Sequence, residues 1–403
     1  MGMIINIDKA LELRTDYNVL KEPLHAMMQS KQEAWEKENP IDMIYNRSTI
    51  SGFQETYTSS IGFAHAFAET SDFAVGPIFN TAEGFSATYR TRTFQGGFII
   101  TQQALEDRQL GKIKDDANAF VKRWHADVVD YAMKSLEGGF GVETTWGTPK
   151  NGGISRIKLT SADTVTGELD GVKNPLFTSE HTIVKRDDMS AADIQNAYQS
   201  NCFHLEIDTT KDSATVVASL ADGITQIITE MENYTDDNGK IAGVTGAKTI
   251  VAANNAYLKG IINTALATDA FAKNEVNYIN QAKDIATAKY TPYLNAIEPT
   301  KDGKGFFIVD KSYNADNHGP EFTERIAFTL DVNNLTRPNG VSYDGRQRFD
   351  INSASWRGIA YVYVGTTAPS TGVFANAKFK KIVPKTNLAK PVSIVGKVTT
   401  EQE

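Results

Sequence analysis

Residues 51–98 constrain the fold of this chain more than any other stretch, because they are rich in aromatic side chains and lack leucine. The stretch holds ten aromatic residues and six glycines but neither leucine nor lysine. Between Phe85 and Thr93, apolar or small residues alternate with polar ones, and a period of two residues predicts a β-strand. We therefore expect a long β-hairpin, an extended loop, in this part of the chain.

This predicted hairpin cannot bury its own aromatic rings, since an isolated pair of strands is only marginally stable in water. The rings need a surface to lie on, which is either another copy of the chain or the edge of the hairpin's own domain. The residues expected at a contact between subunits are aromatic or basic, and they are Phe53, Tyr57, Phe63, Phe67, Phe73, Phe79, Phe85, Tyr89, Arg90 and Arg92.

The clearest helix follows at residues 113–137, where apolar side chains recur every three or four residues and form one face. Two aspartates, Asp115 and Asp116, lie in its first turn, where the helix dipole favours carboxylates, and Gly138 ends it. With the usual rise per residue this helix spans about 40 Å, which suits a structural spine. The side chains expected to pack from it are Phe120, Trp124, Val128 and Tyr131.

The rest of the chain divides into three kinds of sequence. Residues 1–50 have the pattern of a polar arm with short helices, the last of which stops before Pro40. Residues 213–345 alternate predicted helices and strands, which indicates an α/β domain. Residues 140–212 and 346–365 are of β type. The fold class expected from these elements is α+β.

No pattern of residues predicts catalysis. The single cysteine, Cys202, excludes a disulfide framework and a multi-cysteine zinc site. His181 and His204 flank it in sequence, but no nucleophile signature surrounds it, and a free cysteine is usually a small buried hydrophobe. The stretch from Gly243 to Thr249 fails the phosphate-loop spacing, because Ala247 stands where a glycine must precede the lysine. We expect no catalytic, cofactor-binding or metal-binding residues.

Charge and hydropathy exclude two further classes of partner. The chain has 41 basic and 49 acidic residues and a net charge of −8, whereas a protein that grips nucleic acid through its phosphates needs a basic surface. The longest apolar run, Ile359–Val364, is far shorter than the ~20 residues that cross a bilayer. We therefore expect neither specific nucleic-acid binding nor a membrane.

The order of these features resembles the major capsid (head) protein of tailed bacteriophages, with the Hong Kong 97-type shell fold. An arm and an extended loop precede the strand at 97–101, which leads through residues 102–107 into the long helix. An α/β domain follows, and the chain closes with Arg348-Phe349-Asp350 and the run from Trp356 to Tyr361. The resemblance extends from residue 1 to about residue 385 and depends on order and local texture.

The resemblance implies a division of the chain into parts of the shell subunit. These parts are an N-terminal arm at 1–50, an extended loop at 51–98, a peripheral domain at 99–212 and 346–403 with its spine helix at 113–137, and an axial domain at 213–345. The arm and the loop would reach neighbouring subunits, and the axial domains would meet at the centres of hexamers and pentamers.

The resemblance also implies partners and a location. The main partner would be further copies of this chain, joined by scaffolding, portal and decoration proteins. The icosahedral or prolate shell would enclose double-stranded DNA without binding it specifically, and it would be part of the virion after assembly in the bacterial cytoplasm. Some members of the family crosslink the loop through a lysine, but residues 51–98 contain none, so noncovalent contacts are expected.

Other interpretations of the same sequence are open. With only about 50 residues before the loop, scaffolding is expected from a separate protein, unless the chain is already processed. An encapsulin-like nanocompartment shares the fold, although its chains are shorter and their loop is less extended. A phage tail protein would also be rich in β structure, but the long helix and the α/β domain disfavour it. A hydrolase that uses Cys202 or a carboxylate pair is the enzymatic alternative.

Overall fold

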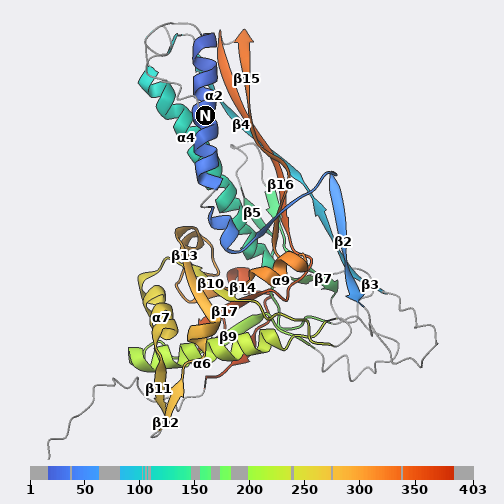
Figure 1. Ribbon diagram of the computed structural model, residues 1–403, viewed down its shortest axis with the longest axis vertical. Helices are drawn as coiled ribbons and strands as arrows, with labels where there is room; N and C mark the ends of the chain where they lie inside the picture. The colour runs from blue at the N-terminus through green and yellow to red at the C-terminus, as the bar shows by residue number, and fades with distance from the viewer. Residues whose placement is uncertain are drawn as a thin grey trace, which may run out of the picture. The chain divides into compact units, whose positions relative to one another are not determined.

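The computed structural model describes most of the chain, namely residues 17–36, 39–62, 82–101, 103–104, 107, 110–146, 155–164, 173–182, 198–236, 240–273, 276–336 and 339–384. The described residues form helices and strands in mixed order (Figure 1). They group into two compact units. Unit 1 comprises residues 1–57, 88–135 and 321–352, and unit 2 comprises residues 58–87, 136–320 and 353–403.

Unit 1 contains a four-stranded sheet next to two helices. The strands, in their order across the sheet, are β1 (Asn46–Thr49), β15 (Glu321–Thr336), β16 (Asn339–Asn352) and β4 (Arg92–Thr101). β1 runs parallel to β15, and the other pairs are antiparallel. The helices are α2 (Tyr17–Glu36) and the 26-residue α4 (Leu110–Ser135), which lie side by side in Figure 1.

The core of unit 1 lies between these helices and the sheet. Helix α4 contributes Ile113, Ala117 and Val121, which lie four residues apart and therefore on one face of the helix. The other buried members come from α2 and from strands β4 and β16, and they are Leu24, Met27, Met28, Ile100, Val341 and Tyr343. The predicted spine helix thus exists, and it ends in a 3-10 turn, η2 (Leu136–Phe140).

Unit 2 is built on a six-stranded sheet. The strands, in their order across the sheet, are β13 (Ala286–Thr291), β10 (Lys248–Ala253), β14 (Gly305–Asp310), β17 (Ile359–Gly365), β9 (Cys202–Glu206) and β18 (Lys380–Ile382). Every residue of β14 is buried, which is consistent with its apolar run Phe306–Val309. The helices are α6 (Ser213–Glu232), α7 (Ala256–Ala267), α8 (Ala282–Ile285) and α9 (Lys311–Asp316).

Short paired strands and single turns complete the two units. The pairs are β2 (Gln54–Gly62) with β3 (Ala82–Arg90), β5 (Thr144–Trp146) with β6 (Ser155–Ile157), β7 (Thr160–Thr164) with β8 (Lys173–Pro175), and β11 (Ala270–Lys273) with β12 (Val276–Ile279). The 3-10 turns besides η2 are η1 (Pro40–Met43), η4 (Pro292–Ala296) and η5 (Gly372–Phe374).

Strand pairing groups the chain differently from the predicted domains. Strands β9, β17 and β18 lie outside residues 213–345, yet they complete the six-stranded sheet of unit 2. Strand β15 begins inside that range but pairs with β1 and β16 in unit 1. Pairing depends on which strand edges meet in space, and alternation along the sequence does not reveal the partner. The boundaries expected at 213 and 345 therefore do not match the units.

A fully buried ion pair fixes one end of β10 in unit 2. Lys248 Nζ donates to Asp310 Oδ2 at 2.9 Å and to the carbonyl oxygens of Val244 and Gly246 at 2.9 and 2.7 Å. Burial alone would raise the pKa of Asp310, but hydrogen bonds from Tyr313 N, Lys248 and Ser312 outweigh it and hold the pKa below its usual value. The phosphate-loop lysine considered above is thus a structural residue.

Lys248→Met should lower the free energy of unfolding by about 3–5 kcal/mol, because it leaves the carboxylate of Asp310 buried without its cation. Lys380→Met is the matched control. Lys380 pairs with Glu230 at 2.7 Å on the exposed surface, so its loss should change the free energy by less than about 1 kcal/mol. Urea denaturation followed by circular dichroism measures both values, and equal effects would contradict the burial of Lys248.

Candidate functional site

The predicted hairpin is shorter in the structure than in the sequence analysis. Strands β2 and β3 form a two-stranded ribbon, and β4 begins after the single residue Thr91. Residues 92–98 therefore belong to the four-stranded sheet of unit 1. We call β2 and β3 the hairpin, and we call Phe53, Tyr57 and residues 88–91 its root. Phe85 lies on β3, whereas Phe63, Phe67, Phe73 and Phe79 lie outside the described residues.

Tyr89 does not lie on an open contact surface, contrary to the prediction. Its side chain is fully buried, together with its neighbours on the same face, Ala87 and Thr91. The ring of Tyr57 packs edge-to-face against that of Tyr89, with 5.1 Å between the ring centroids. The two-residue period correctly predicted a β-strand. At the root, however, the apolar face of that strand is buried within unit 1. For these residues the alternative expectation, packing on the chain's own domain, is the one that fits.

The exposed side of the root carries Phe53 and Arg90. Phe53 is 46% exposed, and the Arg90 guanidinium lies 4.8 Å from the centroid of its ring. The amide N–H of Thr91 donates to Phe53 O at 3.2 Å, which ties the beginning of the hairpin to its end. An exposed aromatic ring beside a cation can contribute to a contact with another protein.

Arg92, at the start of β4, is also exposed, and it interacts with Tyr131 of α4. Its charge and a hydrogen bond act on Tyr131 of α4. Burial is the larger effect on this tyrosine, and it raises the pKa of Tyr131 to about 12. Three of the residues predicted at a contact between subunits are therefore exposed, namely Phe53, Arg90 and Arg92.

Two side chains from the end of β16 bind the root, and neither is among the residues predicted at the site. Asp350 Oδ2 accepts the backbone N–H of Arg90 at 3.0 Å, and Asn352 Nδ2 donates to the carbonyl oxygen of Thr88 at 3.0 Å. Asp350 is only 9% exposed. Its position between the apolar Phe349 and Ile351 was the available signal, because a carboxylate in a buried strand needs donors.

Three of the four residues predicted to pack from the spine helix contact aromatic rings of the sheet. Tyr131 contacts Phe94 of β4 and Phe349 of β16, with ring centroids 5.2 and 5.5 Å apart. Trp124 packs on Phe328 at 4.9 Å, and its indole Nε1 donates to Gln347 Oε1 at 3.0 Å.

Phe120 and Val128 complete this set. Phe120 lies 5.2 Å from the ring of Phe98 on β4 and 6.0 Å from that of Trp124. Val128 is half-buried. Aromatic rings at these separations attract one another beyond their burial, so the contacts fix the register of β4 and β16 against the helix.

Cys202 is not arranged as a nucleophile. It is buried on β9, and burial raises the pKa of its thiol well above the usual value, so the thiol stays protonated. His181 hydrogen-bonds Asp163 and Asn201, both at 3.0 Å, and stacks on Trp356. His204 Nε2 lies 2.9 Å from the carbonyl oxygen of Gly365. These contacts engage both histidines in structural networks of unit 2.

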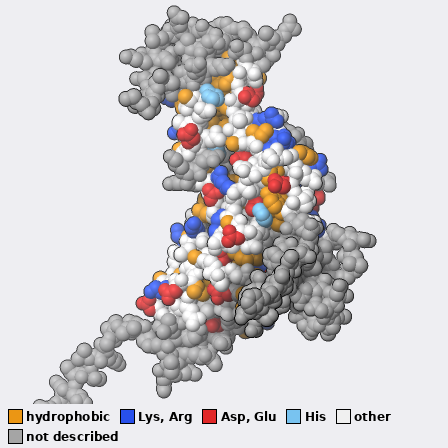
Figure 2. Space-filling model, turned by 45° about the vertical axis from the view of Figure 1, so that its right-hand side comes forward, with side chains coloured by type: hydrophobic (Ala, Val, Ile, Leu, Met, Phe, Trp, Pro, Cys, Tyr) orange, Lys and Arg blue, Asp and Glu red, His pale blue; other side chains and the backbone are white. Residues whose placement is uncertain are grey.

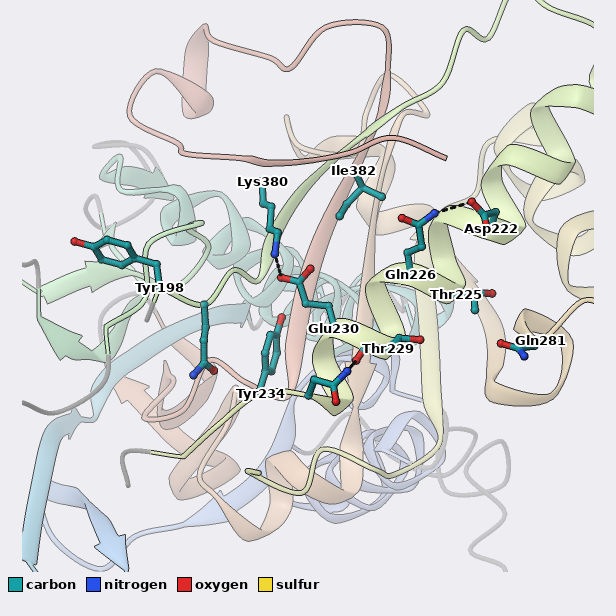
Figure 3. Close-up of a pocket in the computed structure, with 12 residues that line it drawn as sticks. Tyr198, Asp222, Thr225, Gln226, Thr229, Glu230, Tyr234, Gln281, Lys380 and Ile382 are labelled. Carbon is teal, nitrogen blue, oxygen red and sulfur yellow. Dashed lines mark hydrogen bonds and ion pairs between the residues drawn. The ribbon is translucent and has the colours of Figure 1, made fainter. Parts of the chain in front are cut away.

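A polar groove lies along α6 in unit 2 (Figure 3). Its volume is about 600 Å³, and its walls carry the hydroxyls, amides and carboxylates of α6 together with Tyr198 and the strand β18. The charged groups pair with their neighbours: Glu230 with Lys380 at 2.7 Å, and Asp222 with Gln226 at 2.6 Å. These walls can bind water or a polar chain, and they lack a nucleophile next to a base.

The described residues carry neither a cluster of metal ligands nor a helix that could cross a membrane. In these ranges no three histidine, cysteine, aspartate or glutamate side chains converge as a metal site would need. No helix there has both the length and the apolar character to span a bilayer. On the face drawn in Figure 2, basic and acidic side chains are interspersed over the described surface.

No protein-family model matches the chain, and no curated protein is similar to it in sequence. Solved structures align with most of the chain at low sequence identity. A chain from Mycobacterium phage Patience has 13% identity and a TM-score of 0.44, over 89% of this chain and 91% of that one. A chain from the capsid of Myoviridae phage XM1 has 10% identity and a TM-score of 0.41, over 80% and 89%. A chain from the mature capsid of bacteriophage PhiM1 has 9% identity and a TM-score of 0.42, over 81% and 86%.

Tyr89→Ala should lower the free energy of unfolding by about 3–5 kcal/mol, because it empties a fully buried site. Phe53→Ala, on the exposed side of the same root, should lower it by about 1 kcal/mol or less, since that ring mainly contributes its contact with Arg90. Denaturant titration of the two variants gives the difference. A small effect of Tyr89→Ala would mean that the root is open in solution.

Cys202 should react with a thiol reagent such as Ellman's reagent only as the protein unfolds, because its thiol is both buried and protonated. The expected result is slow labelling of the native chain and rapid labelling in urea. Fast labelling of the native chain at neutral pH would show an accessible thiolate and would revive the enzymatic alternative.

Proposed function

We propose that this chain is a structural subunit that assembles with its own copies into the shell of a tailed-phage head. The observation that carries the proposal is the hairpin. Within the described residues, β2 and β3 pair only with each other, and a two-stranded ribbon is too unstable to hold a fixed conformation without a surface to lie on. A neighbouring copy provides that surface in every subunit of a closed assembly.

The rest of the proposed fold follows the Hong Kong 97-type plan. Unit 1, with the long α4 against its sheet, corresponds to the peripheral domain and its spine, and the six-stranded unit 2 provides the axial domain. Residues 1–50 act as the arm. The hairpin of one subunit lies on the next, and this head-to-tail contact closes into hexamers and pentamers.

The chemistry of the shell is noncovalent and nonenzymatic. Residues 51–98 contain no lysine, so the loop has no amine with which to form an isopeptide bond. The net charge of −8 suits a wall that encloses double-stranded DNA without gripping its phosphates. Scaffolding, portal and decoration proteins are the further partners, the virion is the location, and the host cytoplasm is where assembly occurs.

Electron microscopy and sedimentation of the purified full-length chain, alone and with a scaffold partner, test the proposal. The expected result is closed particles or rings of five and six copies. A chain that stays monomeric at high concentration in both conditions would overturn the proposal. Particles filled with an enzyme cargo and free of DNA would favour the encapsulin-like alternative.

Phe85→Asp should leave the subunit folded by circular dichroism but prevent assembly, because it places a charge on the apolar face of the hairpin beyond its root. Ser86→Asp is the matched control, since Ser86 is exposed on the opposite face of the same strand. We expect the control to assemble. If Phe85→Asp assembles as well as the control does, the apolar face of the hairpin is not a main contact between subunits.

A further inference from the structure

The hairpin and the sheet of unit 1 are joined by side chains where main-chain pairing stops. The ladder between β4 and β16 ends at the pair Arg92 and Phe349. The N–H of Arg90, two residues before Arg92, donates to the carboxylate of Asp350. A backbone carbonyl would accept this bond in a continued ladder. The strength of the junction therefore depends on a group that titrates.

A second side chain adds another hydrogen bond between β16 and the root of the hairpin. Asn352 lies on the same face of β16 as Asp350, two residues later, and it donates to the carbonyl oxygen of Thr88. Thr88 and Arg90 are likewise two residues apart on β3. Between β3 and β4, the buried Thr91 belongs to neither strand, and both its N–H and its hydroxyl donate to Phe53 O.

We propose that Asp350 and Asn352 are the positioning residues of the hairpin, and that the protonation of Asp350 controls how firmly its root is held on the sheet. The inference rests on the proposed function, because a neighbouring copy meets the hairpin in the direction that this root gives it. Neither residue needs to touch the neighbour. Each acts through the backbone of β3.

The groups around Asp350 determine the sign of the effect. Burial is the largest influence and raises the pKa of Asp350 from 3.8 to about 6. The backbone N–H groups of Arg90 and Ile351 and the charge of Arg92 oppose it. On α4 the titratable neighbour is Tyr131. On the strands the other charged residues are Arg348, two residues earlier on β16, and Glu321 and Glu324 of β15, which lie opposite Asn352 and Phe349.

Proton binding therefore favours the held root. When the root opens, water reaches the carboxylate, and the pKa of Asp350 returns toward its ordinary value. The closed root thus binds a proton more tightly than the open root, so acid stabilises the closed form and a rise in pH through about 6 loosens it. The protonated group still accepts the Arg90 N–H through its carbonyl oxygen, and it no longer carries a buried charge.

Hydrogen–deuterium exchange of the full-length chain at pH 5 and pH 7.5, corrected for intrinsic exchange, tests this assignment. The protection of the amides at residues 88–90 should be about tenfold weaker at the higher pH, as linkage between the two pKa values requires. Asp350→Asn keeps an acceptor without a charge, so it should be protected equally at both pH values, and at least as strongly as the wild type at pH 5. Asp331→Asn, an exposed aspartate of β15, should behave as the wild type does.

Asn352→Ala provides an independent arm that does not depend on titration. It should raise exchange at residues 88–90 at both pH values and leave the pH dependence intact. The inference is overturned if the wild type shows no pH dependence there, if Asp350→Asn retains it, or if Asn352→Ala leaves exchange unchanged. Should Asp350→Asn not fold, the wild type and Asn352→Ala still decide the outcome.

The same samples separate this inference from the proposed function. Sedimentation reports the assembled fraction, and exchange reports the root. If the chain never assembles but shows the expected exchange, the assignment of the positioning residues is supported and the proposed shell function is contradicted. If the chain assembles but exchange at its root does not depend on pH, the proposed shell function is supported and the assignment of the positioning residues is contradicted.

Discussion

The packing of α4 against β4 and β16 is the interaction on which unit 1 depends. A row of rings from both sides, among them Phe94, Phe98 and Tyr131, fills the space between the helix and the strands. Because interlocking rings tolerate little sliding, they fix where β16 ends and β4 begins. That placement brings Asp350 to Arg90 and positions the root of the hairpin. At that root the rings of Tyr57 and Tyr89 pack against each other.

Local periodicity predicted much of the secondary structure. It did not predict which strands pair when they lie far apart in the sequence. The spine helix, expected at 113–137, is α4 at Leu110–Ser135, and the alternation expected within 213–345 is present in α6, β10 and α7. The long pair β15 and β16 was missed, although Phe328, Leu330 and Val332 alternate with polar residues and Pro338-Asn339-Gly340 is a turn signal. The sequence of a strand does not specify which other strand it pairs with. The division of the chain into two units therefore could not be predicted from the sequence.

The candidate site shows the same limit at the level of single residues. The alternating, aromatic-rich sequence predicted a hairpin, and the structure contains one at β2 and β3. Composition cannot distinguish a ring that is buried, such as Tyr89, from one that is exposed, such as Phe53. The bonds of Asp350 and Asn352 join residues about 260 positions apart in the chain. No spacing rule reaches that far. The signal in the sequence was the carboxylate of Asp350 between two apolar strand residues. A carboxylate buried in this way needs hydrogen-bond donors, and the N–H of Arg90 is one of them.

The order of the segments in unit 1 has a consequence for synthesis on the ribosome. Its sheet combines strands from residues 46–49 and 92–101 with strands from residues 321–352, and most of unit 2 is encoded between them. The apolar face of α4 is therefore translated long before β15 and β16 can cover it, and unit 1 closes only after residue 352 has emerged. Until then the root of the hairpin lacks the two side chains that hold it, so a nascent chain cannot present a finished contact to its neighbours.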